Sequence, residues 1–499
     1  MHNLHTAFHA SVAANPDKTA LFWADAQFSY AHFQGESAAV SRALRERFGI
    51  RPGDRVGLWL RNRPEFVSAL FGVLGADAVA VPVNTFLKPT EVAYLLADAG
   101  VTVLLTEEGM GEAVAELTAS LNFLQILRAE DFAGLPAAVA VGEPLPVSGR
   151  AHADLAVLIY TSGTTGQPKG AMLTHGNLMS NIESCRQVLE VVDFDRFVLL
   201  LPMFHSFMLT VSVLLPLMVG GSIVLIKGLS QPKLMVAEML QSRGTVLPAM
   251  AALFRALAHL PAQVELPLRI CVSGAGPLPS EILRAFNARH PGVPLIEGYG
   301  LSEASPVVCV NPVKGPHHAG TIGPVIPGVE VSVQDDAGAF LPDGTDGELC
   351  VRGPNVMAGY WNAPAKTAET IVNGWLRTGD IGHRRPDGWY VVTDRKKDML
   401  KPNGINVYPR EIEEVIYRFP GIKECAVVGE ADEKRGERAV AFVALDESAA
   451  AGFSDKALLE FLRPQMADYK LPRRVIVLPA LPRNATGKIL KTALREKLA

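Results

Sequence analysis

Residues 157–181 read VLIYTSGTTGQPKGAMLTHGNLMSN: an apolar strand, a loop dense in hydroxyl groups and glycine with one lysine, and then a helix. Glycines free such a backbone to turn tightly and to direct N–H groups at an anion, while the hydroxyls and the lysine add donors and positive charge. Pro168 stands where the usual P-loop spacing needs its second glycine, so this is a phosphate-holding loop of another kind. An ordinary surface loop is the alternative, although few are so rich in hydroxyls. The residues predicted to hold phosphate are Thr161, Ser162, Gly163, Thr164, Thr165, Gly166 and Lys169.

The composition is that of a globular protein without an electrostatic case for nucleic acid. The 499 residues, 48% hydrophobic and 20% charged, suffice for two or three domains with a large core. A net charge of −4 does not indicate the strongly basic face that binds nucleic acid. The five cysteines are far apart and form no Cys-x-x-Cys pair, so neither a disulfide framework nor a zinc site is expected. A reducing cytoplasm fits this cysteine usage.

One long uncharged segment raises the question of a membrane span. Residues 197–226 are thirty residues without Asp, Glu, Lys or Arg, which is enough length to cross a bilayer. Pro202, Pro216 and the pair Gly220-Gly221 divide the segment, however, into strand, turn, helix, turn and strand. The first residues of the chain also lack the basic and apolar regions of a secretory signal. We therefore expect a cytoplasmic protein without a transmembrane segment, and peripheral contact with a membrane stays open.

Apolar strands alternate with helical patterns in two series. Strand, helix, strand at this spacing predicts right-handed βαβ units in parallel sheets, with ligands in the crevice at the strand carboxyl ends. We expect one sheet-centred subdomain for each series. The first series has predicted strands at 56–60, 78–83 and 101–106 and helices at 64–74 and 88–99; the second has strands near 156–160, 222–226 and 268–273 and helices near 177–190, 232–242 and 279–289.

Beyond about residue 320 the pattern changes to short β segments punctuated by glycine, proline and aspartate, which predicts a small β subdomain. Charge density then rises in residues 394–398, and we place a domain boundary there, between 1–396 and 397–499. The second domain includes a helix opened by Pro409 with acidic residues in its first turns. The predicted fold class is α/β: a large N-terminal domain of two parallel-sheet subdomains plus a small β subdomain, and a small, mobile α+β C-terminal domain.

The stretch YTSGTTGQPKG at 160–170 resembles the signature loop of the adenylate-forming superfamily. Its members include acyl-CoA and aryl-CoA synthetases, firefly luciferase and the adenylation domains of peptide synthetases. The likeness extends from about residue 25 to the end of the chain, through several motifs in the same order. It implies an enzyme that uses ATP with Mg²⁺ to activate a carboxylic acid as acyl-AMP, releases pyrophosphate, and in the synthetases transfers the acyl group to CoA.

Two motifs resemble those that hold the nucleotide base and the metal. SGAGPLP begins at Ser273, and the resemblance lays Gly274 and Ala275 against the adenine and the acyl pocket; a tight strand-to-helix turn is compatible with this. EGYGLSE ends at Glu303 and has a serine where threonine is usual. By resemblance this motif and the signature loop supply Tyr299 to stack on adenine, Ser302 to meet the α-phosphate, and Glu303 with Thr161 to hold Mg²⁺.

Further motifs resemble those that hold the ribose, form the hinge and deliver a lysine. WLRTGD ends at Asp380, which by resemblance accepts hydrogen bonds from both ribose hydroxyls, with Arg395 beside it. Lys397 occupies the hinge position. LPRNATGK ends at Lys488, which the resemblance identifies as the adenylation lysine. A cation there would bridge the anionic carboxylate and α-phosphate as charge develops in the transition state.

KPNGINVYPREIE, at residues 401–413, resembles the segment on the other face of the small domain. The residues predicted to contact CoA are Lys401, Gly404 and Asn406. Gly404 would let pantetheine pass close to the backbone after the domain rotates, so that one active site runs two reactions in two domain orientations.

The identity of the acid depends on the segment FHSF at 204–207, which resembles the region that lies over the substrate carboxylate. His205 joins Lys488 and Glu303 as a candidate catalytic residue, although a histidine in an apolar run is commonly a core residue. No aspartate near 204–210 could pair with an ammonium group, which argues against an amino-acid substrate. We expect an apolar acid, a medium- or long-chain fatty acid before an aryl acid of the benzoate or cinnamate type. The alternatives are acyl-AMP transfer to a carrier protein, a luciferase-like oxygenase and a non-enzymatic binding protein.

Overall fold

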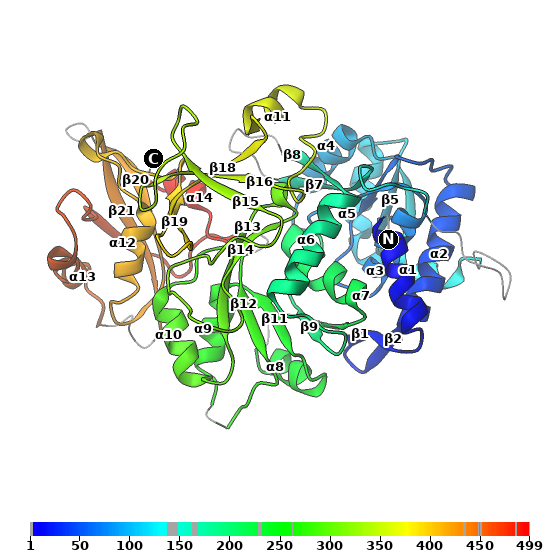
Figure 1. The fold of residues 1–499 in the computed structure, drawn as a ribbon, viewed down its shortest axis with the longest axis horizontal. Helices are drawn as coiled ribbons and strands as arrows, with labels where there is room; N and C mark the ends of the chain where they lie inside the picture. The colour runs from blue at the N-terminus through cyan, green and yellow to red at the C-terminus, as the bar shows by residue number, and fades with distance from the viewer. Residues whose placement is uncertain are drawn as a thin grey trace.

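The computed structural model describes residues 3–136, 148–161, 168–227, 232–261, 263–432, 436–447, 449, 452–484 and 487–498. Figure 1 shows the N-terminal helices at one end of the molecule and the last hundred or so residues of the chain, in orange and red, at the other. Between them lie two large sheets and a smaller antiparallel sheet. This arrangement confirms the predicted α/β class with parallel sheets.

The first large sheet is formed by the first predicted series. It is six-stranded in the order β6-β5-β3-β4-β7-β8, with parallel pairing except between β7 and β8. Its strands are β3 (Arg55–Leu58), β4 (Val79–Pro82), β5 (Val103–Thr106), β6 (Gln125–Arg128), β7 (Leu155–Thr161) and β8 (Lys169–Thr174). The helices of this region are α3 (Glu65–Gly75), α4 (Pro89–Ala99) and α5 (Gly111–Ser120), with 3-10 turns η1 (Glu108–Met110) and η2 (Ala129–Gly134).

The second large sheet is eight-stranded, in the order β14-β13-β12-β11-β9-β10-β1-β2, parallel at its centre and antiparallel at both edges. Its strands are β1 (Thr19–Trp23), β2 (Ala26–Ser29), β9 (Arg196–Leu199), β10 (Ser222–Leu225), β11 (Val246–Ala249), β12 (Ile270–Ser273), β13 (Leu295–Gly300) and β14 (Val307–Val310). The associated helices are α1 (Leu4–Ala14), α2 (Tyr30–Glu46), α6 (His175–Val188), α7 (Leu215–Val219), α8 (Pro232–Gln241), α9 (Ala251–Ala258), α10 (Ser280–Arg289) and the 3-10 turn η4 (Ser302–Ala304).

Two details of this division differ from the prediction. The strand predicted near 156–160 is β7, and it pairs with β4 (Ala80 opposite Val157), so it belongs to the first sheet and not to the second. The second sheet instead takes in β1, from a region for which no strand was predicted, and β1 pairs in parallel with β10 (Leu21 opposite Ile223). Periodicity identifies a strand but not its partner, because pairing depends on contacts distant in sequence.

The signature loop also lies in a different local setting from the one predicted. We expected strand, loop and helix, but β8 follows the loop and pairs antiparallel with β7, with Lys169 opposite Thr161. The helix α6 begins only after this strand, so its N-terminus does not directly follow the loop. Residues 162–167, which include the predicted phosphate contacts Ser162, Gly163, Thr164, Thr165 and Gly166, lie outside the described residues.

The uncharged segment 197–226 folds into the core. It contains β9, the π-helix η3 (Met208–Leu214), α7 and β10, which is the predicted succession of strand, turn, helix, turn and strand. Every residue of the π-helix is buried. Within the described ranges no helix combines the length and the apolar character that a bilayer span needs.

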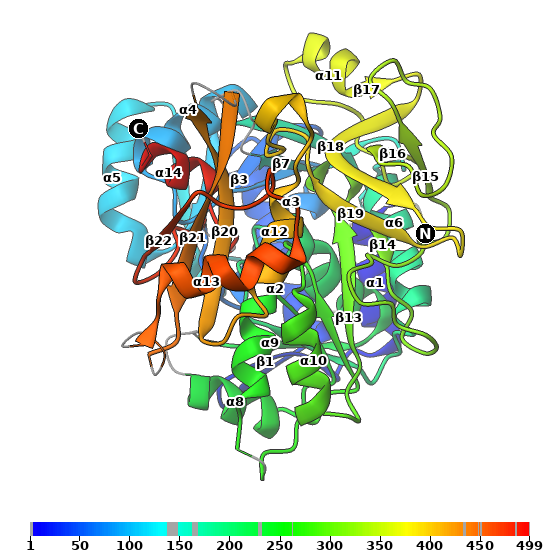
Figure 2. The same cartoon turned by 90° about the vertical axis from the view of Figure 1, so that its left-hand side faces the viewer.

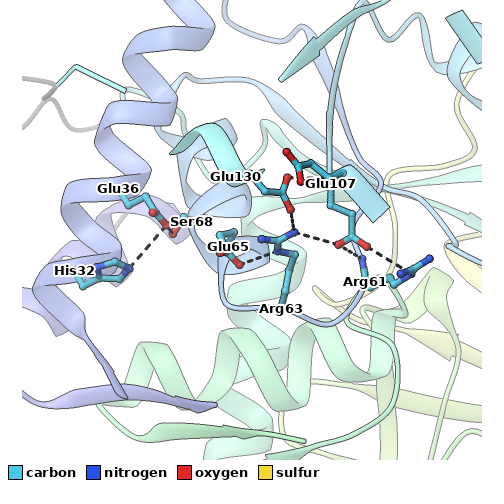
Figure 3. A network of polar contacts seen from close by, with 9 residues as sticks. His32, Glu36, Arg61, Arg63, Glu65, Ser68, Glu107 and Glu130 are labelled. Carbon is cyan, nitrogen blue, oxygen red and sulfur yellow. Dashed lines mark hydrogen bonds and ion pairs between the residues drawn. The ribbon is translucent and has the colours of Figure 1, made fainter. Parts of the chain in front are cut away.

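A short segment after β3 connects the first sheet to the residues just before His205. Asn62 donates from its amide to the carbonyl of Leu201 (2.9 Å) and accepts from the amide of Met203 (2.9 Å). Its neighbour Arg63 lies among three carboxylates, those of Glu65 (2.8 Å), Glu107 (3.5 Å) and Glu130 (2.5 Å), as Figure 3 shows. Burial acts to lower the pKa of Arg63, but the hydrogen bonds and charges of Glu65 and Glu130 together outweigh it and raise the pKa. The network therefore fixes the loop that contacts the 201–203 backbone.

Beyond residue 320 the predicted small β subdomain is present as an antiparallel sheet with α11 (Pro364–Thr370) beside it (Figure 2). Its strands are β15 (Glu330–Gln334), β16 (Gly347–Arg352), β17 (Ile371–Val372), β18 (Trp375–Arg384) and β19 (Tyr390–Arg395).

The last part of the chain has apolar clusters of its own, made only of residues from Leu400 onward. We call this part the C-terminal unit. It consists of η5 (Pro402–Gly404), α12 (Pro409–Ile416), β20 (Ile422–Asp432), β21 (Gly436–Leu445), α13 (Asp455–Leu462), η7 (Arg463–Gln465), β22 (Arg474–Val477) and α14 (Lys491–Glu496). The proposed boundary at Lys397 falls between the end of β19 and the first residue of these clusters.

The five cysteines are all free and buried. Cys271 lies on β12, and Cys309 on β14 is directly opposite Tyr299 on β13. Burial raises the pKa of each of these two thiols well above the ordinary value, so both stay protonated and neutral.

Candidate active site

Strands β13, β18 and β19 meet where β13 ends, at a place that we call the corner. Tyr299 on β13 donates its hydroxyl to Oδ2 of Asp380 on β18 at 2.7 Å. Arg395 on β19 is the cross-strand neighbour of Asp380, and its Nε lies 3.1 Å from Oδ1. Asp380 is buried, and each of its two carboxylate oxygens has a donor. Burial and the Asp380 charge raise the pKa of Tyr299 well above its ordinary range, so the phenol remains a donor. The structure thus gathers three of the predicted nucleotide contacts.

Glu303, in η4, lies beside the signature-loop strand. Its Oε1 faces the Thr161 hydroxyl at 3.3 Å and accepts a hydrogen bond from the Tyr360 hydroxyl at 3.0 Å. Both contacts are to one carboxylate oxygen, so the other keeps its capacity to bind a cation. Hard oxygen ligands of this kind suit Mg²⁺, which usually takes one or two protein carboxylates and completes its shell with phosphates and water. In the described part of the chain no three His, Cys, Asp or Glu side chains form a metal cage, and a single carboxylate fits that mode of binding.

Lys169 begins β8, at the far side of the same corner. Its Nζ lies 5.8 Å from the centroid of the Tyr360 ring, within the range of a cation–π contact. Partial burial and nearby Lys366 lower the pKa of Lys169, while the charges of Glu369 and Glu303 oppose the shift. An anion placed against Lys169 would therefore be favoured, because it would offset the desolvation of the ammonium.

His205 and Ser206 follow the loop held by Asn62. The Phe207 amide donates to Nδ1 of His205 (3.3 Å), so in the neutral ring the proton is on Nε2. Burial, with a smaller contribution from the Lys488 charge, lowers the pKa of His205 to about 4, so the ring is neutral at pH 7. Ser206 is buried, and its hydroxyl is 2.8 Å from that of Ser302. His205 is thus a neutral donor beside the predicted α-phosphate contact.

The SGAG turn packs tightly against this segment. A Cβ atom at Gly274 would lie 2.8 Å from Cζ of Phe207, so only glycine lets the Phe207 ring approach the turn this closely. Ala275 adopts a positive φ of 62°, a conformation that a non-glycine residue rarely takes and that is common at functional turns.

Lys488 reaches the site from the C-terminal unit. Its loop is a tight hairpin in which Arg483 is bridged to Ile489 and the amide of Lys488 donates to Oδ1 of Asn484 (2.8 Å). Gly487, with φ +81°, presses on the large domain so closely that a Cβ there would be 2.2 Å from Cε of Met250. Burial and then the Arg395 charge lower the pKa of Lys488 to about 8, with Asp380 opposing the shift. The hairpin therefore delivers its lysine to the Asp380–Arg395 corner.

The predicted CoA contacts are not part of this cluster. Lys401, Gly404 and Asn406 are exposed in the η5 loop, and no atom lies within 4 Å of a Cβ built on Gly404. Lys397, the predicted hinge residue, is exposed and stands between two ion-paired neighbours. Lys396 pairs with Asp336, in the turn after β15, at 2.6 Å, and Asp398 pairs with Arg495 of the C-terminal unit at 2.6 Å.

Two residues of the corner were not predicted. Tyr360 stands in the GYW sequence before α11, and Arg410 at the start of α12 reaches across to buried Glu297, 3.6 Å from Oε1. Burial raises the pKa of Glu297 to about 7, and Arg410 opposes that shift. Arg410 lies within the 401–413 motif, but the sequence assigned no role to it or to Tyr360, because each contacts a partner far away along the chain.

Comparisons with known proteins agree with this geometry. Residues 8–361 match the family model described as AMP-binding enzyme, and residues 411–488 match the AMP-binding enzyme C-terminal domain. A long-chain-fatty-acid–CoA ligase of Escherichia coli O6:H1 is 34% identical over 98% of this chain and 93% of its own length. A feruloyl-CoA synthase of Amycolatopsis sp. is 35% identical over 97% of this chain and 96% of its own.

A solved structure is similar over the full length. ATP-bound MatB from Rhodopseudomonas palustris superposes with a TM-score of 0.92 at 30% identity, covering 100% of this chain and 99% of its own. The apo form of the same protein gives a TM-score of 0.80 with the same coverage. The structure described here is therefore more similar overall to the ATP-bound form than to the apo form. The chain belongs to the AMP-binding enzyme family, and it is an acid–thiol ligase of the adenylate-forming acyl-CoA synthetase superfamily.

Proposed function

We propose that the chain activates an apolar monocarboxylic acid, in the first place a medium- or long-chain fatty acid, and transfers its acyl group to CoA. In the first step a carboxylate oxygen forms a bond to the α-phosphorus of ATP, and the bond from that phosphorus to the bridging oxygen of the β-phosphate breaks. Pyrophosphate leaves with the electron pair. In the second step the CoA sulfur, having lost its proton, attacks the acyl carbon, and AMP leaves.

The observation that carries this proposal is the convergence of Lys488, His205 and the Asp380–Arg395 pair from different parts of the chain. Lys488 and His205 are close enough for the charge of one to lower the pKa of the other. A protonated lysine and a neutral N–H donor on opposite sides of a reacting centre suit two anions that must approach each other. We assign the carboxylate to His205 and the carboxylate–phosphate contact to Lys488.

The other residues of the site suit the binding of the nucleotide. Asp380 would accept the ribose hydroxyls through lone pairs not used by Tyr299 and Arg395. Glu303 and Thr161 would hold Mg²⁺, whose positive charge would offset the negative charge of the triphosphate. We assign Lys169, together with residues 162–166 of the signature loop, to the β- and γ-phosphates that leave as pyrophosphate. Ser302, tied to Ser206, would meet the α-phosphate.

The CoA step would need a second orientation of the C-terminal unit. Lys401, Gly404 and Asn406 are exposed, while Lys488 interacts electrostatically with Arg395 and Asp380. We propose that the unit turns about Lys397, between the domains 1–396 and 397–499, so that the η5 loop replaces the Lys488 hairpin. The exposed position of Lys397 between two separately anchored neighbours supports this assignment.

The apolar surroundings of His205 support the class of acid. The segments 197–226 and 299–313 contain one charged residue, Glu303, and its carboxylate already contacts Thr161 and Tyr360. An amino acid or a dicarboxylate would bring a second charge with no partner there, which is costly in a buried site. The similarity to a long-chain-fatty-acid–CoA ligase supports the same class.

An aryl acid is the second candidate. The feruloyl-CoA synthase of Amycolatopsis sp. is as similar to this chain as the fatty-acid ligase is, and the aromatic ring of Phe207 lies close to Gly274, two residues after His205.

The test is a pyrophosphate-release screen with fatty, aryl, dicarboxylic and amino acids, with and without CoA and with an acyl carrier protein as an alternative acceptor. We expect CoA-dependent turnover that is fastest with an apolar monocarboxylic acid. Preference for an amino acid, or turnover with the carrier protein but not with CoA, would refute the proposal.

A further inference from the structure

We propose that Tyr360 is a positioning residue that ties the metal-binding carboxylate to the leaving-group lysine, so that Glu303 and Lys169 form one preorganised pyrophosphate-release unit. The proposal rests on the function proposed above, and it concerns a residue that contacts neither the acid nor the reacting phosphorus. Tyr360 touches both members of the pair, through two different parts of one side chain.

The hydroxyl end of Tyr360 fixes Glu303. It donates to Oε1 at 3.0 Å, the same oxygen that faces the Thr161 hydroxyl at 3.3 Å. With two neutral donors on one oxygen, the carboxylate is held in one rotation and its other oxygen is directed elsewhere. An outer hydrogen bond of this kind orients a metal ligand without itself binding the metal.

The ring of Tyr360 lies under Lys169. The separation of 5.8 Å between Nζ and the ring centroid places the ammonium over an aromatic face, which attracts a cation without neutralising it. An ion pair at this position would compete with phosphate for the lysine. The ring therefore holds the ammonium of Lys169 in position and leaves its charge available to bind phosphate.

The backbone around Tyr360 makes this placement rigid. The segment runs beside β8 and exchanges hydrogen bonds with it: the Met172 amide donates to the Gly359 carbonyl at 2.9 Å, and the Trp361 amide donates to the Gly170 carbonyl at 2.8 Å. Upstream, the Met357 amide donates to the carbonyl of Glu303 itself at 2.8 Å. Tyr360 is thus anchored on one side to the strand that carries Lys169 and on the other to the turn that carries Glu303.

The experiment compares Tyr360→Phe, which removes only the hydroxyl, with Tyr360→Leu, which also removes the ring. Tyr390→Phe is the matched control, since the buried Tyr390 also donates its hydroxyl, to the Val331 carbonyl at 2.8 Å, but away from the site. The readout is Mn²⁺ affinity, measured by electron paramagnetic resonance in the presence of α,β-methylene-ATP, which cannot release pyrophosphate. Binding of this nucleotide itself is measured by calorimetry.

We expect Tyr360→Phe to weaken Mn²⁺ binding about tenfold, the usual effect of losing an outer-shell partner, and to raise the Mg²⁺ concentration for half-maximal adenylate formation by a similar factor. Tyr360→Leu should in addition weaken nucleotide binding. Neither variant should slow thioester formation from preformed acyl-AMP, and the control should match the wild type in each assay.

Mn²⁺ affinity unchanged in Tyr360→Phe, or reduced equally in Tyr390→Phe, would overturn the inference. Because this measurement needs no turnover, it stays informative if the wild type fails to form an adenylate with any acid, an outcome that would refute the proposed function alone. Tyr360→Phe also keeps the ring and its packing, so the test does not depend on whether Tyr360→Leu folds.

Discussion

Two loops of the C-terminal unit differ in what surrounds them. The 483–489 hairpin is pressed against the large domain so tightly that Gly487 has no room for a Cβ beside Met250. The 400–407 loop is closed by a similar backbone bridge, Leu400 to Val407, but Gly404 at its tip has open space around it. Both loops use a glycine with positive φ, one for close contact and one facing solvent. In this structure, therefore, the C-terminal unit places the loop that carries Lys488 against the large domain and leaves Gly404 of the 400–407 loop exposed to solvent.

The largest effect is expected in the hairpin that contacts the large domain. Lys488→Ala should slow acyl-adenylate formation by about a hundredfold or more, because it removes a cation from the centre where negative charge develops. Thioester formation from preformed acyl-AMP should be preserved. Stopped-flow measurement of the two half-reactions checks this, and equal losses in both would contradict the assignment of Lys488 to one orientation only.

In the exposed 400–407 loop, a substitution is expected to slow the transfer of the acyl group to CoA instead. Gly404→Leu should slow the CoA step roughly tenfold, because a side chain would occupy the open space and would also be strained at φ +77°. Adenylate formation should stay near the wild-type rate. Gly344→Leu is the control, since Gly344 also has positive φ (80°) and open surroundings but lies in the antiparallel sheet region. A loss in both Gly404→Leu and the control would indicate a general effect of strain.

The contacts that hold the present orientation offer a way to sharpen the comparison. Arg255 on α9 pairs with Asp446 at 2.7 Å and donates to the carbonyls of Ile422 and Lys423, all in the C-terminal unit. Arg255→Ala should slow adenylate formation about fivefold, the order expected for charged hydrogen bonds at a partly exposed site, without slowing the CoA step. Arg284→Ala, which removes an exposed arginine that pairs with Glu281 of the same helix α10, is the control. A slower CoA step in Arg255→Ala would argue against a role in orientation.

The smallest effect is a pH dependence. Burial depresses the pKa of Lys488, so its protonated form is lost as the pH rises through about 8. The kcat/KM for ATP in adenylate formation reports the free enzyme, and we expect it to fall across that range. Lys488→Arg, which stays protonated, should be slower but should lack this decline, and thioester formation from acyl-AMP should not share it. A decline that persists in Lys488→Arg would assign the titration to another group.

The sequence predicts the elements better than it predicts their partners. The strands and helices of both series lie close to their predicted positions, because a buried parallel strand and an amphipathic helix have distinct local patterns. The membership of β7 in the first sheet and of β1 in the second could not be predicted, since no local pattern states which strand lies alongside.

The same limit applies to the site. Tyr299, Asp380, Arg395 and Lys488 could be named in advance because they stand in motifs, and the structure brings them together. Tyr360 and Arg410 could not, because a lone tyrosine or arginine is informative only when its distant partner is known.

The buried cysteines have a consequence for the fidelity of the reaction. An acyl-adenylate is a mixed anhydride that would acylate any accessible thiolate, and Cys309 lies directly opposite Tyr299 in the sheet that forms the corner. Because all five thiols are buried, and burial raises the pKa of Cys309, none is offered to the intermediate as a nucleophile. Self-acylation at a cysteine is therefore disfavoured, and no internal thiolate competes with the sulfur of CoA.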